Sequence, residues 1–588
     1  MHLERPTVSI LISLLLCTGC SWSAQRATVA ARLPATTSKD PKGLAEELFA
    51  ERLDQTPRLA DTLESKSPRA TWGREGEWST RPAFERLAGI RVARIDSAIE
   101  IADEDERETL VRIRAELRYE ALEPALTRDR DPLGPLRGFL RTGLLHLFLD
   151  HPIERGTDLE AYRARLQALV TWTEQAAEHS SAFPGSMAPL PSTLAYLERI
   201  ASPAFADLMG DRVAKRARMA MELTPSSRLQ TLQAIDILLR SSLPMAAKKM
   251  LAVLEAPNRT QPRRGLARQA GGLSLYKKRI KQLVSANDTV SEIDNRLTIQ
   301  SRELEAALLQ ITEAIDFTGG SLELLAQIRE QYDQSVKHPP GETARLELLT
   351  QQAMKAAQIL GPLLPINLEE LPTTVLLPKA LLPLTDGVIH QQAHHGRGQF
   401  SRVWVDPSRL HAAVSDSLAV HWILGAAAVA HCDGPTSELP RWLRHAEWPG
   451  WNEALGLYLV RLQEEVHPRR DPWQRAAGIG LELECTARGL TDLGLHVHGW
   501  SRAEAIEFLQ RRSISDRAQV ELWVDDCFDR PGLALAAPLT LQQILAARAE
   551  LRQRQGVTFD LLAFHRALLE VGPLPVDLCQ SGILRRGR

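Results

Sequence analysis

The chain has 588 residues, of which 44% are hydrophobic and 24% charged, proportions typical of a globular protein. Lysine and arginine total 71 and aspartate and glutamate total 73, so the formal net charge is -2. Because there is no surplus of basic residues, the composition gives no support for a nucleic-acid partner, and we expect none.

The first twenty residues predict export. Arg5 precedes an apolar run from Val8 to Leu16, which is shorter than the roughly 20 apolar residues that a membrane-spanning helix needs. A short apolar run after a basic residue is typical of a secretory signal. Small residues before Cys20 resemble the cleavage motif of bacterial lipoproteins, although Cys17 stands where that motif usually has leucine.

We therefore predict that residues 1–20 form a lipoprotein signal peptide with lipidation at Cys20, and that residues 21–44 form a flexible tether. The alternative is a plain secretory signal that is cut after a nearby small residue. Ser21 replaces the aspartate that would favour inner-membrane retention. We expect a lipid anchor in the outer membrane, with the protein facing the periplasm.

Four cysteines follow the predicted signal. They are widely spaced and form no C-x-x-C pair, which argues against a structural zinc site: Cys432, Cys485, Cys527 and Cys579. An oxidising compartment would permit disulfides between them, and buried free thiols are the alternative.

From residue 45 onward the apolar pattern is mainly helical. Two long amphipathic helices are marked by Leu110, Ile113, Leu117 and Ala121, and by Ile293, Leu297, Leu304, Leu308 and Ile311. Gly319 and Gly320 end the second helix, and a further helix runs to about Val336. Such faces could bind a coiled-coil partner, but packing within an all-helical body is the simpler interpretation.

Prolines at Pro339–Pro340 and from Pro362 to Pro383 separate the front of the chain from its C-terminal part. Thr373–Leu377 and Phe400–Val405 are predicted strands, being short and rich in β-branched or aromatic residues. We predict a mainly α fold with a small β element. It comprises a helical region at residues 45–380 and a C-terminal helical core at 381–588, and the two form one unit. The chain carries no phosphate-binding, dinucleotide-binding or serine-hydrolase motif.

The C-terminal part contains fragments of a helical zinc-peptidase site. Such a site needs two histidines one helical turn apart, a glutamate beside the first as general base, and a third ligand from a later helix. His421 lies in an apolar helix, Glu453 opens Glu-Ala-Leu-Gly-Leu-Tyr, and His496 ends Asp-Leu-Gly-Leu-His. However, Trp422 follows His421, and His431, ten residues on, lies about 280° around the helix.

These blocks resemble a bacterial domain-of-unknown-function family, number 885, whose members resemble zinc-dependent peptidases. The closest match runs from Arg488 to Ser501, with further matches at Phe400–Pro407, Ser415–His421, Glu453–Leu462 and Phe564–Pro575. The resemblance is firm from about residue 400 to 580 and loose from 45 to 400. It implies a large multi-helix, gluzincin-like peptidase fold, with zinc in the ancestral site.

The departures from the family fall on the residues that carry its chemistry. Trp422 replaces the general base, and Gly425 to Ala428 contain no histidine where the family has a pair. Asp526–Cys527 replaces an Arg-Tyr pair, and Ala537 replaces a tyrosine. Because scaffold glycines, prolines and leucines remain, we predict a catalytically degenerate relative that binds peptide or protein without cleaving it.

We thus expect no bound cofactor or metal and no intact catalytic site, only vestiges at His421, Trp422, Glu453 and His496. If a metal binds, His421, Glu453 and His496 would hold it. The alternative functions are an active metallohydrolase with this rearranged site and a purely structural envelope protein. Three of these residues also have a structural interpretation: His421 as a core histidine with one hydrogen bond, Glu453 as a helix cap or the partner of an arginine, and His496 as a packed histidine in a loop-like segment.

Two other histidine groups are weaker candidates. His390, His394 and His395 have metal-ligand spacing, but they precede Gly396-Arg397-Gly398, which is typical of an exposed loop. His445 and Glu447 superficially resemble the missing zinc motif, yet they are out of register with Glu453. We assign no function to either group.

Overall fold

The computed structural model describes residues 40–55, 71–72, 81–128, 133–182, 188–218, 220, 223–284, 288–337, 341–368, 371–385, 387–391, 401–410, 412–433, 442, 448–467 and 470–587. The predicted signal, Cys20 and most of the tether lie outside these ranges, as do His394, His395, His445 and Glu447. Among the described residues, no helix combines the length and apolarity needed to cross a bilayer.

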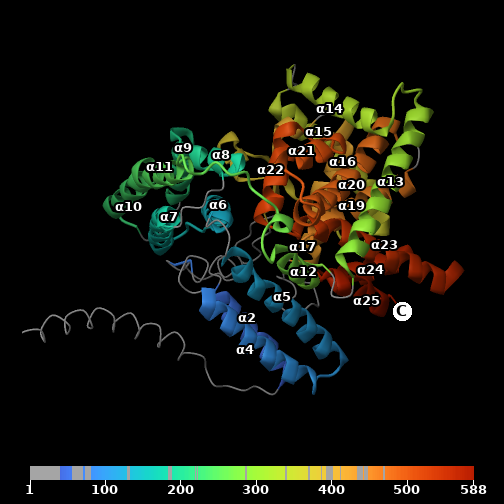
Figure 1. Ribbon diagram of the computed structural model, residues 1–588, viewed down its shortest axis with the longest axis horizontal. Helices are drawn as coiled ribbons and strands as arrows, with labels where there is room; N and C mark the ends of the chain where they lie inside the picture. Colours follow the sequence, from blue (N-terminus) through green and yellow to red (C-terminus); the bar gives the residue numbers. More distant parts are fainter. Residues whose placement is uncertain are drawn as a thin grey trace, which may run out of the picture.

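Three helices form the N-terminal group: α2 (Pro41–Gln55), α4 (Arg81–Ile99) and α5 (Glu104–Arg128). Figure 1 shows α2, α4 and α5 lying alongside one another at one side of the molecule. Their core contains Leu48, Ile95 and Leu117, and it also takes in Trp442 from the C-terminal part of the chain. The helix predicted from Leu110 to Ala121 is therefore confirmed. Residues 41–44 of the predicted tether are helical, and Leu44 is buried.

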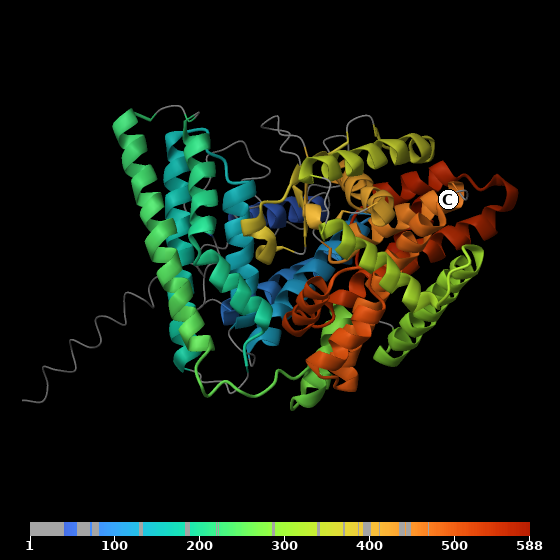
Figure 2. The same ribbon diagram turned by 90° about the horizontal axis from the view of Figure 1, so that it is seen from above.

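A second group is a bundle with its own apolar core. Its members are α6 (Leu133–Leu149), α7 (Gly156–Ala182), α8 (Pro191–Ile200), α9 (Pro203–Ala217), α10 (Pro225–Ile237), the π-helical turn η3 (Leu238–Ser242) and α11 (Leu243–Leu254). In Figure 2 this bundle occupies one end of the molecule. The long α10–η3–α11 rod packs against α7, α8 and α9.

The C-terminal group surrounds α20 (Pro472–Leu493), which is buried along nearly its whole length. Around it lie α12 (Gly272–Leu283), α13 (Val290–Ala314), α14 (Ser321–Lys337), α15 (Glu342–Leu360), α16 (Ala412–Leu418), η9 (Ala419–Leu424), α17 (Gly425–Asp433), α19 (Trp451–Val466), η10 (Gly494–His498), α21 (Arg502–Arg511), α22 (Arg517–Asp529), α23 (Ala536–Gln555), α24 (Leu561–Val571) and α25 (Val576–Arg586). Helices α13 and α14 confirm the predicted helices around Gly319 and Gly320. Because α13–α15 share this core with α16–α25, the C-terminal group includes helices that precede residue 380.

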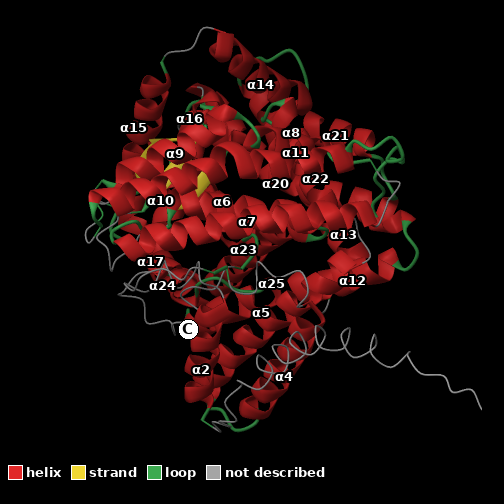
Figure 3. Ribbon diagram, turned by 90° about the vertical axis from the view of Figure 1, so that its left-hand side faces the viewer, coloured by secondary structure: helices red, strands yellow, loops and turns green. Residues whose placement is uncertain are grey.

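The small β element is a three-stranded sheet in the order β1-β3-β2, drawn in yellow in Figure 3. β1 (Thr373–Leu376) runs parallel to β3 (Arg402–Val405), and β2 (Val388–Gln391) runs antiparallel to it. The sequence predicted β1 and β3 but not β2. Side chains of β3 alternate between two cores: Val403 and Val405 belong to the C-terminal core, and Trp404 belongs to the bundle core. The sheet therefore joins the two helical groups.

The four cysteines after the predicted signal are all buried free thiols. This resolves the choice left open by the sequence. Burial raises the pKa of Cys485 and Cys527 well above the ordinary thiol value and raises the pKa of Cys579 to about 12. These thiols are therefore protonated at neutral pH and serve as small apolar groups in the core.

Candidate functional site

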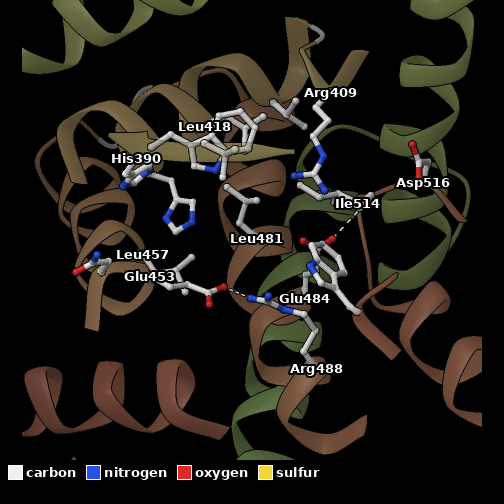
Figure 4. A pocket seen from close by; sticks show the side chains of 17 residues that line it. His390, Arg409, Leu418, Glu453, Leu457, Leu481, Glu484, Arg488, Ile514 and Asp516 are labelled. Atoms are coloured by element: carbon white, nitrogen blue, oxygen red, sulfur yellow. Dashed lines mark hydrogen bonds and ion pairs between the residues drawn. The ribbon is translucent and has the colours of Figure 1, made fainter. Parts of the chain in front are cut away.

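A cavity of about 280 Å³ lies in the C-terminal group, where β2, α16, η9, α19, α20 and α22 meet (Figure 4). Six of its lining side chains are aliphatic: Val388, Val414, Leu418, Leu457, Leu481 and Ile514. The others are polar, charged or aromatic: His390, Arg409, His421, Trp422, Asn452, Glu453, Glu484, Arg488, Ser515, Asp516 and Trp523. A ligand site usually combines apolar side chains with convergent polar groups, and this cavity offers both.

His421 reaches this cavity from the π-helical turn η9, in the middle of the apolar segment that runs from α16 into α17. π-Helical turns are rare and are frequent at functional sites. The ring lies against the backbone of α19 at Gly456, where a Cβ atom would stand 2.5 Å from Nδ1. Glycine in the Glu-Ala-Leu-Gly-Leu-Tyr block is therefore what allows the histidine and α19 to approach so closely.

Burial lowers the pKa of His421 to about 3, and positive charge at His390 and Arg488 acts in the same direction. The imidazole is therefore neutral at physiological pH. Its Nδ1 atom is buried and makes no hydrogen bond of normal geometry to any described residue. The backbone at Gly456 nevertheless opposes the lowering of this pKa slightly.

Trp422 also lines the cavity and is 6% exposed. It belongs to the C-terminal core together with Ile423 and Leu424. An indole N–H donates a hydrogen bond but accepts no proton at ordinary pH. The position beside His421 therefore offers an apolar surface and no general base.

Glu453 enters the cavity from the first turn of α19, three residues after the αL N-cap residue Gly450 (φ 81°). Its carboxylate forms an ion pair with Arg488 of α20, marked by a dashed line in Figure 4. The guanidinium of Arg488 also lies 4.8 Å from the ring centroid of Trp523 on α22. The interpretation of Glu453 as the partner of an arginine is thus confirmed.

Glu484 stands one helical turn before Arg488 on α20 and is buried. Burial raises its pKa, while hydrogen bonds from Ser513 and Ser515 act in the opposite direction. The carboxylate accepts from the hydroxyl of Ser513 and from the backbone N–H of Ser515, the latter at 3.2 Å. Glu484 is therefore held by the segment between α21 and α22.

His496 does not line the cavity. It is 1% exposed, and its Nδ1 accepts a hydrogen bond from the backbone N–H of Leu266 at 3.0 Å. Its Nε2 lies 2.9 Å from the carbonyl oxygen of Cys527, which makes Nε2 the protonated nitrogen. The ring also stacks on Tyr276, with centroids 5.3 Å apart.

The prediction that His496 lies in a loop is wrong, because the π-helical turn η10 continues α20 through His498. The helix ends at Gly499, whose φ of 72° is a backbone conformation that glycine adopts without strain. Gly494 is needed for a different reason, since a Cβ there would stand 2.1 Å from the indole of Trp500.

The segment with the closest resemblance to the family is thus a scaffold element. Asp492 accepts hydrogen bonds from the hydroxyl of Tyr276 at 2.6 Å and from the backbone N–H of Gly532 at 2.8 Å. Together with His496, it ties α20 to α12 and to the turn before α23. Packing alone therefore accounts for most of the Asp-Leu-Gly-Leu-His block.

The donor set at the cavity does not fit the zinc site that the resemblance implies. His421 and Glu453 line one cavity, whereas both ring nitrogens of His496 bond to the scaffold elsewhere. The charge of Arg488 beside Glu453 opposes a cation at that carboxylate. In the part of the chain that the structure describes, no three His, Cys, Asp or Glu side chains are grouped so as to hold a metal ion.

Several lining residues carry no signal in the sequence. Arg409 follows β3, and Trp523 lies in α22, three residues before the Asp526–Cys527 pair; neither belongs to a matched motif. His390 lies on β2, the strand that sequence reasoning missed, and His431 is not among the lining residues. The sequence does point to Arg488, because this residue precedes Asp492 by one helical turn in the closest-matching block.

The model of a family described as "Bacterial protein of unknown function (DUF885)" matches residues 430–583, which are 154 of the 588 residues. The matched segment contains Glu453, Arg488 and His496 but begins after His421 and Trp422. No curated protein matches the chain.

Two solved structures share the fold over nearly the whole chain. One is described as "the putative lipoprotein from Colwellia psychrerythraea" and has a TM-score of 0.77 at 16% identity, covering 93% of this chain and 98% of its own. The other is described as "a putative lipoprotein of unknown function from Shewanella oneidensis" and has a TM-score of 0.64 at 14% identity, covering 92% and 99%. The chain is therefore similar to a bacterial family of unknown function over residues 430–583, and to these two proteins in overall fold.

Proposed function

We propose that this chain is an exported, lipid-anchored protein of the outer membrane that faces the periplasm, and that its cavity binds a peptide or protein segment without cleaving it. On this view the C-terminal group is a catalytically degenerate relative of zinc peptidases. The similarity to two proteins described as lipoproteins and the small residues before Cys20 support the anchor.

One observation carries the proposal: the cavity holds His421 and Glu453 but lacks the groups that would make them catalytic. Glu453 is paired with Arg488, and Trp422 occupies the position beside His421. A general base contributes on the order of 10² to 10⁴ in rate, so its replacement by an indole removes most of the catalytic power of such a site.

The shape and composition of the cavity support binding. Its volume of about 280 Å³ equals the space of roughly nine water molecules in the liquid, enough for one or two side chains. The aliphatic wall provides apolar contact, and the polar groups at Arg409, Glu484 and Arg488 can orient a ligand. This combination suits the end of a chain or one anchor side chain better than a long extended segment.

The test uses the purified full-length protein. Its metal content is measured by plasma mass spectrometry, and a mixed peptide library is incubated with it in the presence of zinc. We expect less than one zinc per ten chains, an unchanged library, and saturable binding of a subset of peptides. Stoichiometric zinc with cleavage that Glu453→Gln abolishes would instead establish a working metallohydrolase. Neither binding nor cleavage would leave a structural role.

The anchor is tested separately in cells. Labelling with a radioactive fatty acid should mark the wild-type protein and fail to mark Cys20→Ala, which should also lose its membrane association. Equal labelling of both chains, or of neither, would contradict the lipid anchor at Cys20.

A further inference from the structure

Two arginines line the cavity, and their surroundings differ. Arg488 forms an ion pair with Glu453, and its guanidinium carbon lies 4.8 Å from the ring centroid of Trp523. Arg409 lies on the other side of the cavity, 5.8 Å from the centroid of the same indole ring. Both guanidinium groups therefore lie near the indole ring of Trp523, and that of Arg488 is already paired with the carboxylate of Glu453.

The side chain of Arg409 is held in place by the backbone. It follows β3 in the short 3₁₀ turn η8 (Pro407–Arg409), and its guanidinium lies against Gly387. A Cβ at Gly387 would stand 2.7 Å from Nε and 2.8 Å from Cζ, and the φ of 93° there also requires glycine. The backbone N–H of Asp406 donates a hydrogen bond to the carbonyl oxygen of Gly387 at 2.8 Å, which fixes the backbone segment that the guanidinium contacts. Contact with this backbone therefore positions the guanidinium.

The acidic side chains of the cavity wall are engaged elsewhere. Glu453 is paired with Arg488, and Asp516 caps α22 by accepting from the backbone N–H of Gln519 at 2.8 Å. Glu484 accepts hydrogen bonds from Ser513 and Ser515, and burial raises the pKa of this carboxyl more than the positive charge of Arg409 lowers it. Within the described ranges, Arg409 forms no ion pair, and its buried Nη2 has no hydrogen-bond acceptor.

A buried donor without an acceptor is costly, and a charged one more so. The planar fork of a guanidinium matches a carboxylate, which can accept two parallel hydrogen bonds from it. In Figure 4 the guanidinium of Arg409 points into the cavity towards Ile514, with Leu418 and Leu481 on the adjoining wall. A ligand whose carboxylate binds Arg409 would therefore place its apolar part against these aliphatic side chains.

We propose that the cavity recognises an apolar carboxylate, namely the free C-terminal carboxylate of a peptide whose last side chain is apolar. The carboxylate binds Arg409, and the side chain packs on Leu418, Leu481 and Ile514. This inference rests on the proposed function, because it names the part of the peptide that the cavity binds. A short fatty acid carries the same chemistry and is the other source of such a group.

The test measures affinities by calorimetry for three probes: acetyl-Ala-Leu-Leu with a free carboxylate, the same peptide as its C-terminal amide, and decanoate. We expect the wild-type protein to bind the free acid at least tenfold more tightly than the amide. Arg409→Gln should weaken binding of the acid ten- to hundredfold and leave the amide unchanged. The matched control Arg517→Gln removes an exposed arginine of α22 that lies outside the cavity and should change nothing.

The outcomes separate the inference from the proposed function. Equal affinity for acid and amide would overturn the inference and leave peptide binding intact. Decanoate binding that depends on Arg409, without binding of either peptide, would support the carboxylate site and overturn peptide binding. No binding of any probe would overturn both. If Arg409→Gln does not fold, Arg409→Lys keeps the charge and loses the fork, and the comparison of acid with amide on the wild-type protein still decides.

Discussion

His421 and His496 each lie in a π-helical turn, but His421 borders a cavity and His496 is almost fully buried. His421 in η9 borders a cavity with charged walls, and its Nδ1 makes no hydrogen bond of normal geometry to any described residue. His496 in η10 is enclosed by Leu266, Cys527 and Tyr276, and both of its ring nitrogens are satisfied. The same sequence resemblance singles out both histidines, yet His421 belongs to the cavity and His496 to the scaffold that packs around α20.

The comparison teaches that a motif can persist for reasons of packing. The block around His496 is explained by buried hydrogen bonds and by two glycines whose space or backbone angle no other residue fits. On the cavity side of His421 no such hydrogen bonds are seen among the described residues, and Trp422 lies beside it. Substitutions in the scaffold should therefore mainly change stability, whereas substitutions at the cavity should mainly change binding.

The largest effect is expected for Trp422→Glu, which places a carboxylate beside His421 at a nearly buried position. Loss of the indole from the core and burial of an unpaired charge should lower the free energy of unfolding by about 4 kcal/mol. If the proposed function is right, peptide cleavage should not appear. Chemical denaturation and a peptide assay check this, with Trp422→Phe as the control. A stable, cleaving variant would contradict the account.

The next effect distinguishes the two histidines directly. His496→Ala leaves the N–H of Leu266 and the carbonyl of Cys527 unsatisfied and should lower the free energy of unfolding by about 3 kcal/mol. His421→Ala should cost less than about 1 kcal/mol, since it removes no hydrogen bond of normal geometry. Urea denaturation measures both values. Equal losses would show that the contrast between site and scaffold is wrong.

A pH effect of similar size is expected from His565 in the scaffold. Its Nε2 accepts from the hydroxyl of Tyr458 and its Nδ1 donates to the carbonyl of Leu363, each at 2.6 Å. Burial lowers the pKa of His565 from 6.5 to about 4. The unfolded chain therefore binds more protons between these values, so the free energy of unfolding falls by about 3 kcal/mol as pH drops from 6.5 to 4.

The control for this pH effect is His565→Gln, which retains hydrogen-bonding groups but does not titrate. The free energy of unfolding of the variant should depend less on pH between 6.5 and 4 than that of the wild type. Parallel pH curves for the two proteins would show that His565 is not the group responsible.

The smallest change in stability is expected for Glu453→Gln at the cavity. The ion pair with Arg488 is partly exposed, with 33% of the Glu453 side chain accessible, so its loss should cost about 1 kcal/mol or less. Removal of this negative charge from the cavity should strengthen binding of a free-acid peptide severalfold, as calorimetry would show. A large drop in stability with no change in affinity would place Glu453 in the scaffold beside His496.

The sequence predicted the features that local patterns encode. The apolar face from Ile293 to Ile311 is buried as expected in α13, and the β-branched runs form β1 and β3. The strand β2 was missed because only Val388 and Ile389 of its four residues are β-branched, and the polar residues His390 and Gln391 follow them.

The cavity could be predicted only in part. His421 and Glu453 lie in the blocks that carry the resemblance, whereas Arg409 is held by its contact with Gly387, which no spacing reveals. His496 was misassigned to a loop because Gly494 and Gly499 are typical of turns. In the structure the first makes room for Trp500, and the second ends the helix.

The most direct test of the central claim is mass spectrometry of a defined peptide library after incubation with the purified full-length protein and zinc. The account predicts that peptides with free, apolar C-termini are retained by the protein and recovered at their original masses. Recovery of shortened peptides, suppressed by His421→Ala or Glu453→Gln, would contradict it.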